Sequence, residues 1–151
     1  MPRPDIYRNL RIKDDVKIDP ACGSGNFLTE SYISIRRLEN EAIRMEKNLL
    51  EGQMTLEGSG DEDIGVRVSI SQFYGIEIND FVVAVAKAAL WIAEARMLRE
   101  TKSESNISQD FLPLKTNANI VEENALRIDW NDVVDKHKLN YIMGNPPFAG
   151  Y

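Results

Sequence analysis

The sequence predicts an α/β fold built on a doubly wound parallel sheet. Three observations lead to this prediction: short strand-like runs alternate with helical patterns, each of the first two runs precedes one long helix, and 151 residues suffice for one buried core. Right-handed crossovers then place the strands in parallel order. Because ligands bind at the carboxyl ends of strands in this class, the residues just after each strand are candidate functional residues.

The first strand is expected at residues 16–19, and Pro20 ends it. A turn with two glycines occupies 20–25, and a long amphipathic helix follows until Gly52 stops it. The apolar residues that step by three or four along this helix are Leu28, Tyr32, Ile35, Leu38, Ala42, Met45 and Leu49. Their spacing predicts that they form one apolar stripe.

The second strand is expected at 73–78, and the alternating residues 66–70 are a candidate extension of it. Asn79 and Asp80 are expected to cap a second helix, from 81 to about 99. Apolar side chains cover most of the circumference of this helix, which predicts burial on several sides.

Two further short strands are expected after a polar linker, at 119–122 and 140–144. Residues 128–134 separate them. The resulting order of strands and helices is the one that predicts the parallel sheet.

Composition and charge narrow the class of protein. The net charge is −6, and residues 51–66 carry five acids and no bases, so we expect an acidic loop insertion there. The longest apolar run, 81–90, contains Lys87 and is shorter than the ~20 residues of a membrane span. No targeting segment is recognisable, and the single cysteine, Cys22, excludes an internal disulfide and fits a reducing cytoplasm. No Cys/His cluster predicts a metal site.

The first two predicted strands end in candidate ligand-binding residues. Asp19 ends the first strand, and Gly23 and Gly25 allow the following backbone to pass close to a ligand. Such a turn serves packing as often as binding, so the pattern alone leaves both readings open. Glu77, near the end of the second strand, stands where an acid binds ribose hydroxyls in nucleotide-type folds, although this residue taken alone slightly favours an ordinary exposed strand-end acid.

The fourth predicted strand leads into Asn145-Pro146-Pro147-Phe148. The two prolines fix φ and remove two N–H donors, which holds the Asn145 side chain and the Pro146 carbonyl as rigid acceptors beside an aromatic ring. The structural alternative is a rigid loop in which Phe148 covers the core.

Together, residues 19–28 and 145–148 resemble the first and fourth motifs of S-adenosylmethionine-dependent adenine-N6 DNA methyltransferases. Residues 76–81 and 89–93 further resemble the methyltransferase domain of large type II restriction-modification enzymes. The resemblance implies a Rossmann-like sheet of the class I methyltransferase type, of which residues 1–151 would be the N-terminal part with the first four strands. It also implies S-adenosylmethionine as cofactor and double-stranded DNA as a partner of the full-length protein.

The resemblance assigns roles to individual residues. The residues implied in cofactor binding are Asp19, Ala21, Gly23, Gly25, Glu77, Ile78 and Asn124. Asn124 stands where the family usually has an Asp that binds the amino group of the cofactor's adenine. The residues implied in catalysis are Asn145, Pro146 and Phe148. No metal is implied.

Other functions remain open at this point. A protein-glutamine or RNA methyltransferase shares the Asn-Pro-Pro-aromatic run, and a non-catalytic module would keep the cofactor cleft alone. We further expect the isolated chain to be inactive, to bind DNA weakly because it is acidic, and to expose its fourth strand as an unfinished sheet edge through which two copies could pair.

Overall fold

The computed structural model describes residues 14–53, 66–105 and 116–147. They form a four-stranded sheet with the order β3-β2-β1-β4, in which every neighbouring pair is parallel. The strands are β1 (Val16–Asp19), β2 (Phe73–Glu77), β3 (Asn119–Glu122) and β4 (Leu139–Ile142). The predicted fold class is confirmed, and the fourth strand lies slightly earlier in the chain than the sequence indicated.

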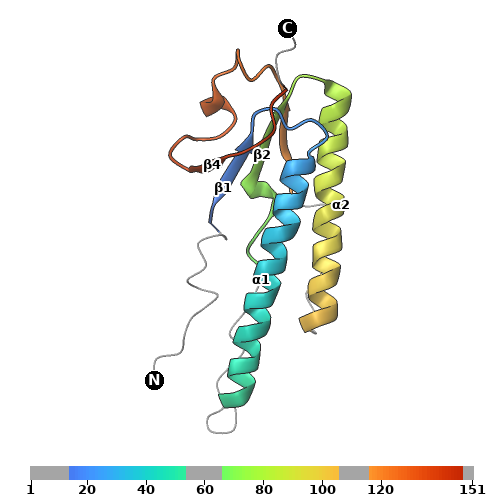
Figure 1. Ribbon diagram of the computed structural model, residues 1–151, viewed down its shortest axis with the longest axis vertical. Helices are drawn as coiled ribbons and strands as arrows, with labels where there is room; N and C mark the ends of the chain where they lie inside the picture. Colours follow the sequence, from blue (N-terminus) through green and yellow to red (C-terminus); the bar gives the residue numbers. More distant parts are fainter. Residues whose placement is uncertain (1–13, 54–65, 106–115, 148–151) are drawn as a thin grey trace.

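Two long helices lie side by side on one face of the sheet (Figure 1). They are α1 (Asn26–Gln53) and α2 (Asp80–Ser105). Their facing sides and the sheet enclose the main core, where the rings of Tyr32 and Phe73 meet edge to face with centroids 5.6 Å apart. The core thereby fixes the start of each helix against the strand that precedes it.

The other face of the sheet is covered without a long helix among the described residues. Val134 and the segment around the short 3₁₀ helix η4 (Trp130–Asp132) pack there on Ile18 and Ile76. The indole of Trp130 donates a hydrogen bond to the Ala125 carbonyl at 2.8 Å, which folds this segment back on itself. The central strands are therefore buried on both faces, as in other parallel sheets.

The predicted stripe of α1 is only partly correct. Leu28, Tyr32 and Ala42 are buried, whereas Leu38, Met45 and Leu49 are exposed. α1 has 28 residues, about 42 Å, and extends far past the short strands (Figure 1). The buried face of α1 also carries the polar side chains of Arg36, Glu39 and Asn40.

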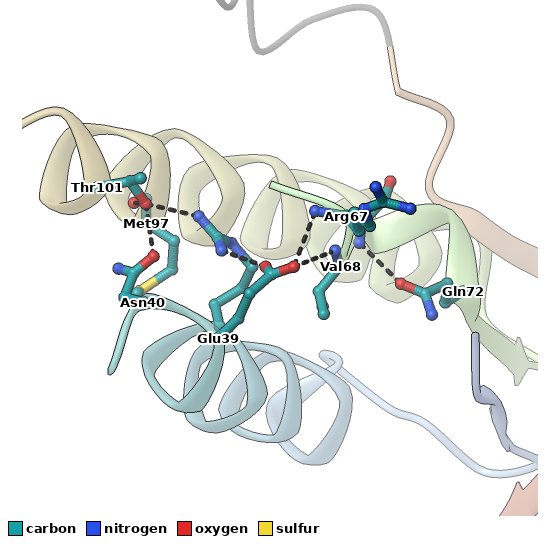
Figure 2. A network of polar contacts seen from close by, with 9 residues as sticks. Glu39, Asn40, Arg67, Val68, Gln72, Met97 and Thr101 are labelled. Atoms are coloured by element: carbon teal, nitrogen blue, oxygen red, sulfur yellow. Dashed lines mark hydrogen bonds and ion pairs between the residues drawn. The ribbon is translucent and has the colours of Figure 1, made fainter. Parts of the chain in front are cut away.

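Those polar groups form a buried network between α1, α2 and the chain that enters β2 (Figure 2). The Glu39 carboxylate pairs with Arg36 and accepts the amide hydrogens of Arg67 and Val68 at 2.8 and 3.1 Å. Arg36 also donates to the Thr101 hydroxyl at 2.7 Å, and that hydroxyl donates to Asn40 at 2.8 Å. Charges and hydroxyls thus join the two helices where the sheet no longer supports them.

The predicted strand extension at 66–70 is wrong. Its amides at Arg67 and Val68 bond to the Glu39 side chain instead of a neighbouring strand. The segment then continues into a short 3₁₀ helix, η2 (Ile70–Gln72). A reciprocal capping box between Ser69 and Gln72 stabilises the start of this helix.

The predicted burial of α2 on several sides is also wrong within the described residues. Ala86, Leu90 and Met97 are fully buried, but Phe81 and Ile92 are 72% and 69% exposed. Trp91 lies at the edge of the buried face, and its indole donates to the Thr116 carbonyl at 3.0 Å. No described helix is long and apolar enough to cross a membrane.

The expected acidic insertion at 51–66 begins inside a helix. Residues 51–53 form the last turn of α1, and residues 54–65 lie outside the described part of the chain.

Candidate cofactor and catalytic site

The candidate site lies at the carboxyl ends of β1, β2 and β4. The sheet order reverses between β1 and β4, because β1 leads to β2 on one side while β4 returns on the other. Parallel sheets bind ligands at such a reversal. The two halves of the predicted site, the residues after β1 and the residues after β4, are therefore brought to one place.

Asp19 ends β1 as a buried carboxylate that is 2% exposed. Its Oδ1 accepts the amide hydrogen of Ala21 at 3.0 Å. Burial raises the pKa of Asp19 above its ordinary value, and the negative Glu77 raises it further, while the Ala21 amide opposes the shift. An ionised Asp19 is therefore costly until a cation offsets its charge.

The glycine turn is fastened to the end of β2. The Cys22 amide donates to the Ile76 carbonyl at 3.1 Å, and the Gly23 amide donates to Glu77 Oε2 at 3.1 Å. Glu77 Oε1 accepts from Ile78 and Asn79 at 2.9 and 3.0 Å. Glu77 thus bridges both loops, and Oε2 keeps acceptor capacity for a ligand hydroxyl.

The two glycines of the turn serve different purposes. Both have positive φ, +52° at Gly23 and +80° at Gly25. A Cβ at Gly23 would meet nothing within 4 Å, so open space lies above this residue. A Cβ at Gly25 would lie 3.2 Å from the Cβ of Ala86, so Gly25 allows α2 to pack against the turn. The prediction that Gly23 faces a ligand is compatible with this geometry, whereas Gly25 has a packing role.

Cys22 is buried inside the turn. Burial raises its thiol pKa to about 12, and the negative charges of Asp19 and Glu77 contribute. The thiolate that a nucleophile requires is therefore scarce near neutral pH. Cys22 therefore serves as a small packing residue of the core.

Ile78 and Asn124 lie beside Glu77. Ile78 is 66% exposed directly after β2. The Glu123 amide donates to the Glu77 carbonyl at 2.9 Å, which brings the loop after β3 alongside. The side-chain oxygen of Asn124, which the resemblance directs at an adenine amino group, accepts the Leu126 amide at 3.0 Å. In this conformation that oxygen closes a local turn.

The residues after β4 reach the same end of the sheet. The Met143 amide donates to the Ile18 carbonyl at 2.9 Å, so pairing with β1 continues past β4. Gly144 follows beside the Asp19 carboxylate, and Asn145 and Pro146 are exposed beyond it. Phe148 lies outside the described residues. Sequence reasoning missed Gly144, although a glycine directly before Asn-Pro-Pro was a visible signal.

A cavity of about 670 Å³ lies next to the site but does not contain its carboxylates. It opens between the start of α1 and β4, and its lining includes Lys17, Phe27, Tyr141 and Met143. Among the described residues there is no group of three or more His, Cys, Asp or Glu side chains that could hold a metal ion.

Comparison with known proteins identifies the family. The model of the MmeI DNA-methyltransferase domain matches residues 7–151. The chain belongs to this family. DNA methyltransferase A of Bacillus subtilis (strain 168) is 43% identical over 135 residues, which are 87% of this chain and 14% of that protein.

A solved structure agrees with this assignment. The type IIL restriction-modification enzyme MmeI, solved in complex with DNA, is 35% identical and superposes with a TM-score of 0.76. The match covers 93% of this chain and 18% of that chain. The resemblance to DNA methyltransferases of restriction-modification systems is confirmed, and the chain spans less than a fifth of the length of either relative.

Proposed function

We propose that this chain is the cofactor- and base-binding part of an enzyme that transfers a methyl group from S-adenosylmethionine to N6 of adenine in DNA. The observation that carries the proposal is the pairing of β1 with the chain through Met143, which brings Asn145 and Pro146 to the end of the sheet that holds Asp19. Electrophile-binding and amine-binding groups then share one site.

The residues present fit this cofactor. Asp19 and Glu77 stand at the two sides of the turn, and open space lies above Gly23. S-adenosylmethionine, when bound, supplies an electrophilic methyl group on a sulfonium cation. Asp19 would complement the positive methionine end, and Glu77 Oε2 would accept a hydrogen bond from a ribose hydroxyl. The exposed Ile78 would pack on the adenine of the cofactor.

The catalytic residues act on the amine of the target base. The lone pair of the adenine amine is delocalised into the ring, which makes the amine a poor nucleophile. The Asn145 side-chain oxygen and the Pro146 carbonyl accept hydrogen bonds from the two N–H groups of the amine. These bonds direct its lone pair toward the methyl group. Positive charge develops on the amine during attack, so these fixed dipoles stabilise the transition state more than the ground state. With the cofactor bound, the new N–C bond would form as the C–S bond breaks, S-adenosylhomocysteine would be the leaving group, and the methylated amine would release one proton to water. In-line alignment of the amine with the methyl group supplies the remainder of the catalysis.

The base must leave the duplex to reach this site. Phe148 offers a face for stacking on the extruded adenine, worth about 1–3 kcal/mol in single-strand binding proteins. The net charge of −6 does not favour contact with phosphates, so we assign the grip on double-stranded DNA, and the choice of target sequence, to other parts of a full-length protein. A restriction-modification system is the proposed context.

The test identifies the methylated base. The full-length protein is incubated with DNA and tritiated S-adenosylmethionine, and the DNA is hydrolysed to nucleosides and separated. We expect the label in N6-methyldeoxyadenosine. Label in a cytosine derivative would overturn the choice of base, and cofactor binding without transfer to DNA would support a non-catalytic module instead. RNA and protein substrates in parallel reactions test the other methyltransferase classes.

A further inference from the structure

We propose that Gly144 is a positioning residue, whose missing side chain lets the backbone directly before Asn145 and Pro146 lie against the Asp19 carboxylate. The inference rests on the proposed function and deepens it. It concerns a residue outside both recognised motifs.

The first support is the space at Gly144. A Cβ on this residue would lie 2.8 Å from the Asp19 carboxyl carbon and 3.2 Å from Oδ2, and it would overlap Oδ1. The φ of Gly144 is +152°, at the edge of the range that disfavours residues with a side chain. Any other residue here therefore forces either Asp19 or the chain at residues 144–146 to move.

The second support is that Asp19 is buried within the sheet, whereas residues 145–147 are exposed. Asp19 lies on β1 between β2 and β4, is 2% exposed, and is bonded to the Ala21 amide. Residues 145–147 are exposed and belong to no strand. An added methyl group would therefore displace Asn145 and Pro146 away from the sheet. The amine acceptors would then lose their alignment while the cofactor contacts stay in place.

The third support is the contrast with three other glycines of the described chain, Gly23, Gly25 and Gly75. A Cβ at Gly23 enters open space, and a Cβ at Gly25 meets Ala86. At Gly75 it would collide with apolar side chains of the core, 2.7 Å from Ile120. Among these four glycines, Gly144 is the one whose Cβ would meet a functional carboxylate.

The test separates positioning from binding in the full-length enzyme. For Gly144→Ala we expect kcat at saturating cofactor and DNA to fall about 100-fold, while the calorimetric Kd for S-adenosylmethionine stays within about threefold. Gly23→Ala is the matched control, because it also adds a methyl group at a positive φ but places it in the open space above the glycine turn of residues 20–25. There we expect the opposite split, a raised Kd with a smaller change in kcat.

A double-mutant cycle tests the contact itself. Asp19→Asn keeps the bulk of the side chain, so Gly144→Ala should cost as much in that background as in the wild type. Asp19→Ala makes room, so the additional loss should shrink. Equal additional losses in both backgrounds would overturn the inference. If Gly144→Ala alone does not fold, the double variant with Asp19→Ala should recover folded protein, and failure to do so would also overturn it.

The remaining outcomes are equally decisive. A Gly144→Ala enzyme with wild-type kcat, or one whose Kd rises as much as its kcat falls, contradicts the inference. A wild-type enzyme that methylates cytosine would overturn the proposed function but not this test, because kcat is measured on whichever base accepts the methyl group.

Discussion

Glu77 shows how one side chain can organise both loops of the site. Its carboxylate accepts amide hydrogens from Gly23, Ile78 and Asn79, and it retains acceptor capacity toward a ligand. The sequence predicted that Glu77 ends a strand beside the glycine turn. It could not predict the bond to Gly23, because 54 residues separate the two and no local pattern records such a contact.

Replacing Glu77 by Gln should weaken cofactor binding about tenfold or more, because an amide nitrogen would face an N–H donor on one side of the bridge. Isothermal titration with S-adenosylmethionine measures the change. Glu122→Gln, at the exposed end of the neighbouring strand β3, is the control and should bind as the wild type does. Unchanged affinity in Glu77→Gln would remove Glu77 from the site.

The raised pKa of Asp19 predicts a pH dependence of cofactor affinity. A cationic ligand binds the ionised carboxylate, so affinity should fall as the pH drops through a pKa above 3.8. Stability has the opposite sign: the folded state holds this proton more tightly, so the contribution of Asp19 to the free energy of unfolding decreases as the pH rises through that range. Asp19→Asn should remove both trends, and a titration profile identical to that of the wild type would contradict the assignment.

At the scale of elements, the sequence predicted both long helices but not the faces they bury. Apolar periodicity located α1, yet Leu38 and Met45 are exposed while Arg36 and Glu39 are buried. The pattern failed there because the partners of that stretch are polar groups of α2 and of the chain before β2. Hydrophobic spacing carries no signal for a buried ion pair.

Breaking this network should strongly destabilise the fold. Glu39→Ala leaves Arg36 as a buried, uncompensated charge, so we expect the free energy of unfolding to fall by about 3–5 kcal/mol in chemical denaturation. Glu41→Ala is the matched control on the same helix, because it removes an exposed pair with Arg44 that is worth about 0–1 kcal/mol. Equal effects of the two substitutions would show that the buried network is not stabilising.

In the sheet that the described residues form, β4 is one of the two edge strands, and its Tyr141 and Ile142 are 53% and 62% exposed. The strands, their parallel order and the approach of the chain before Asn145 to Asp19 could be predicted from the sequence, because they follow from the alternation of strands and helices and from the order of the motifs. The covering of the second face by η4 could not, because short irregular segments have no periodicity.

The open edge predicts that isolated copies of this chain pair through β4. Light scattering at high concentration should report a dimer, and Ile142→Lys should restore the monomer by placing a charge on the edge. The same substitution at Ile92, on the exposed face of α2, should leave the dimer intact. A monomeric mass at every concentration would contradict this prediction.

Methyl transfer to adenine by Asn145→Ala in the full-length enzyme tests the proposed mechanism most directly. We expect kcat to fall about 100-fold or more, because one of the two hydrogen-bond acceptors for the amine is lost. Asn48→Ala, on the exposed side of α1, is the control and should keep wild-type activity. If Asn145→Ala methylates adenine as fast as the wild type, the proposed mechanism is wrong.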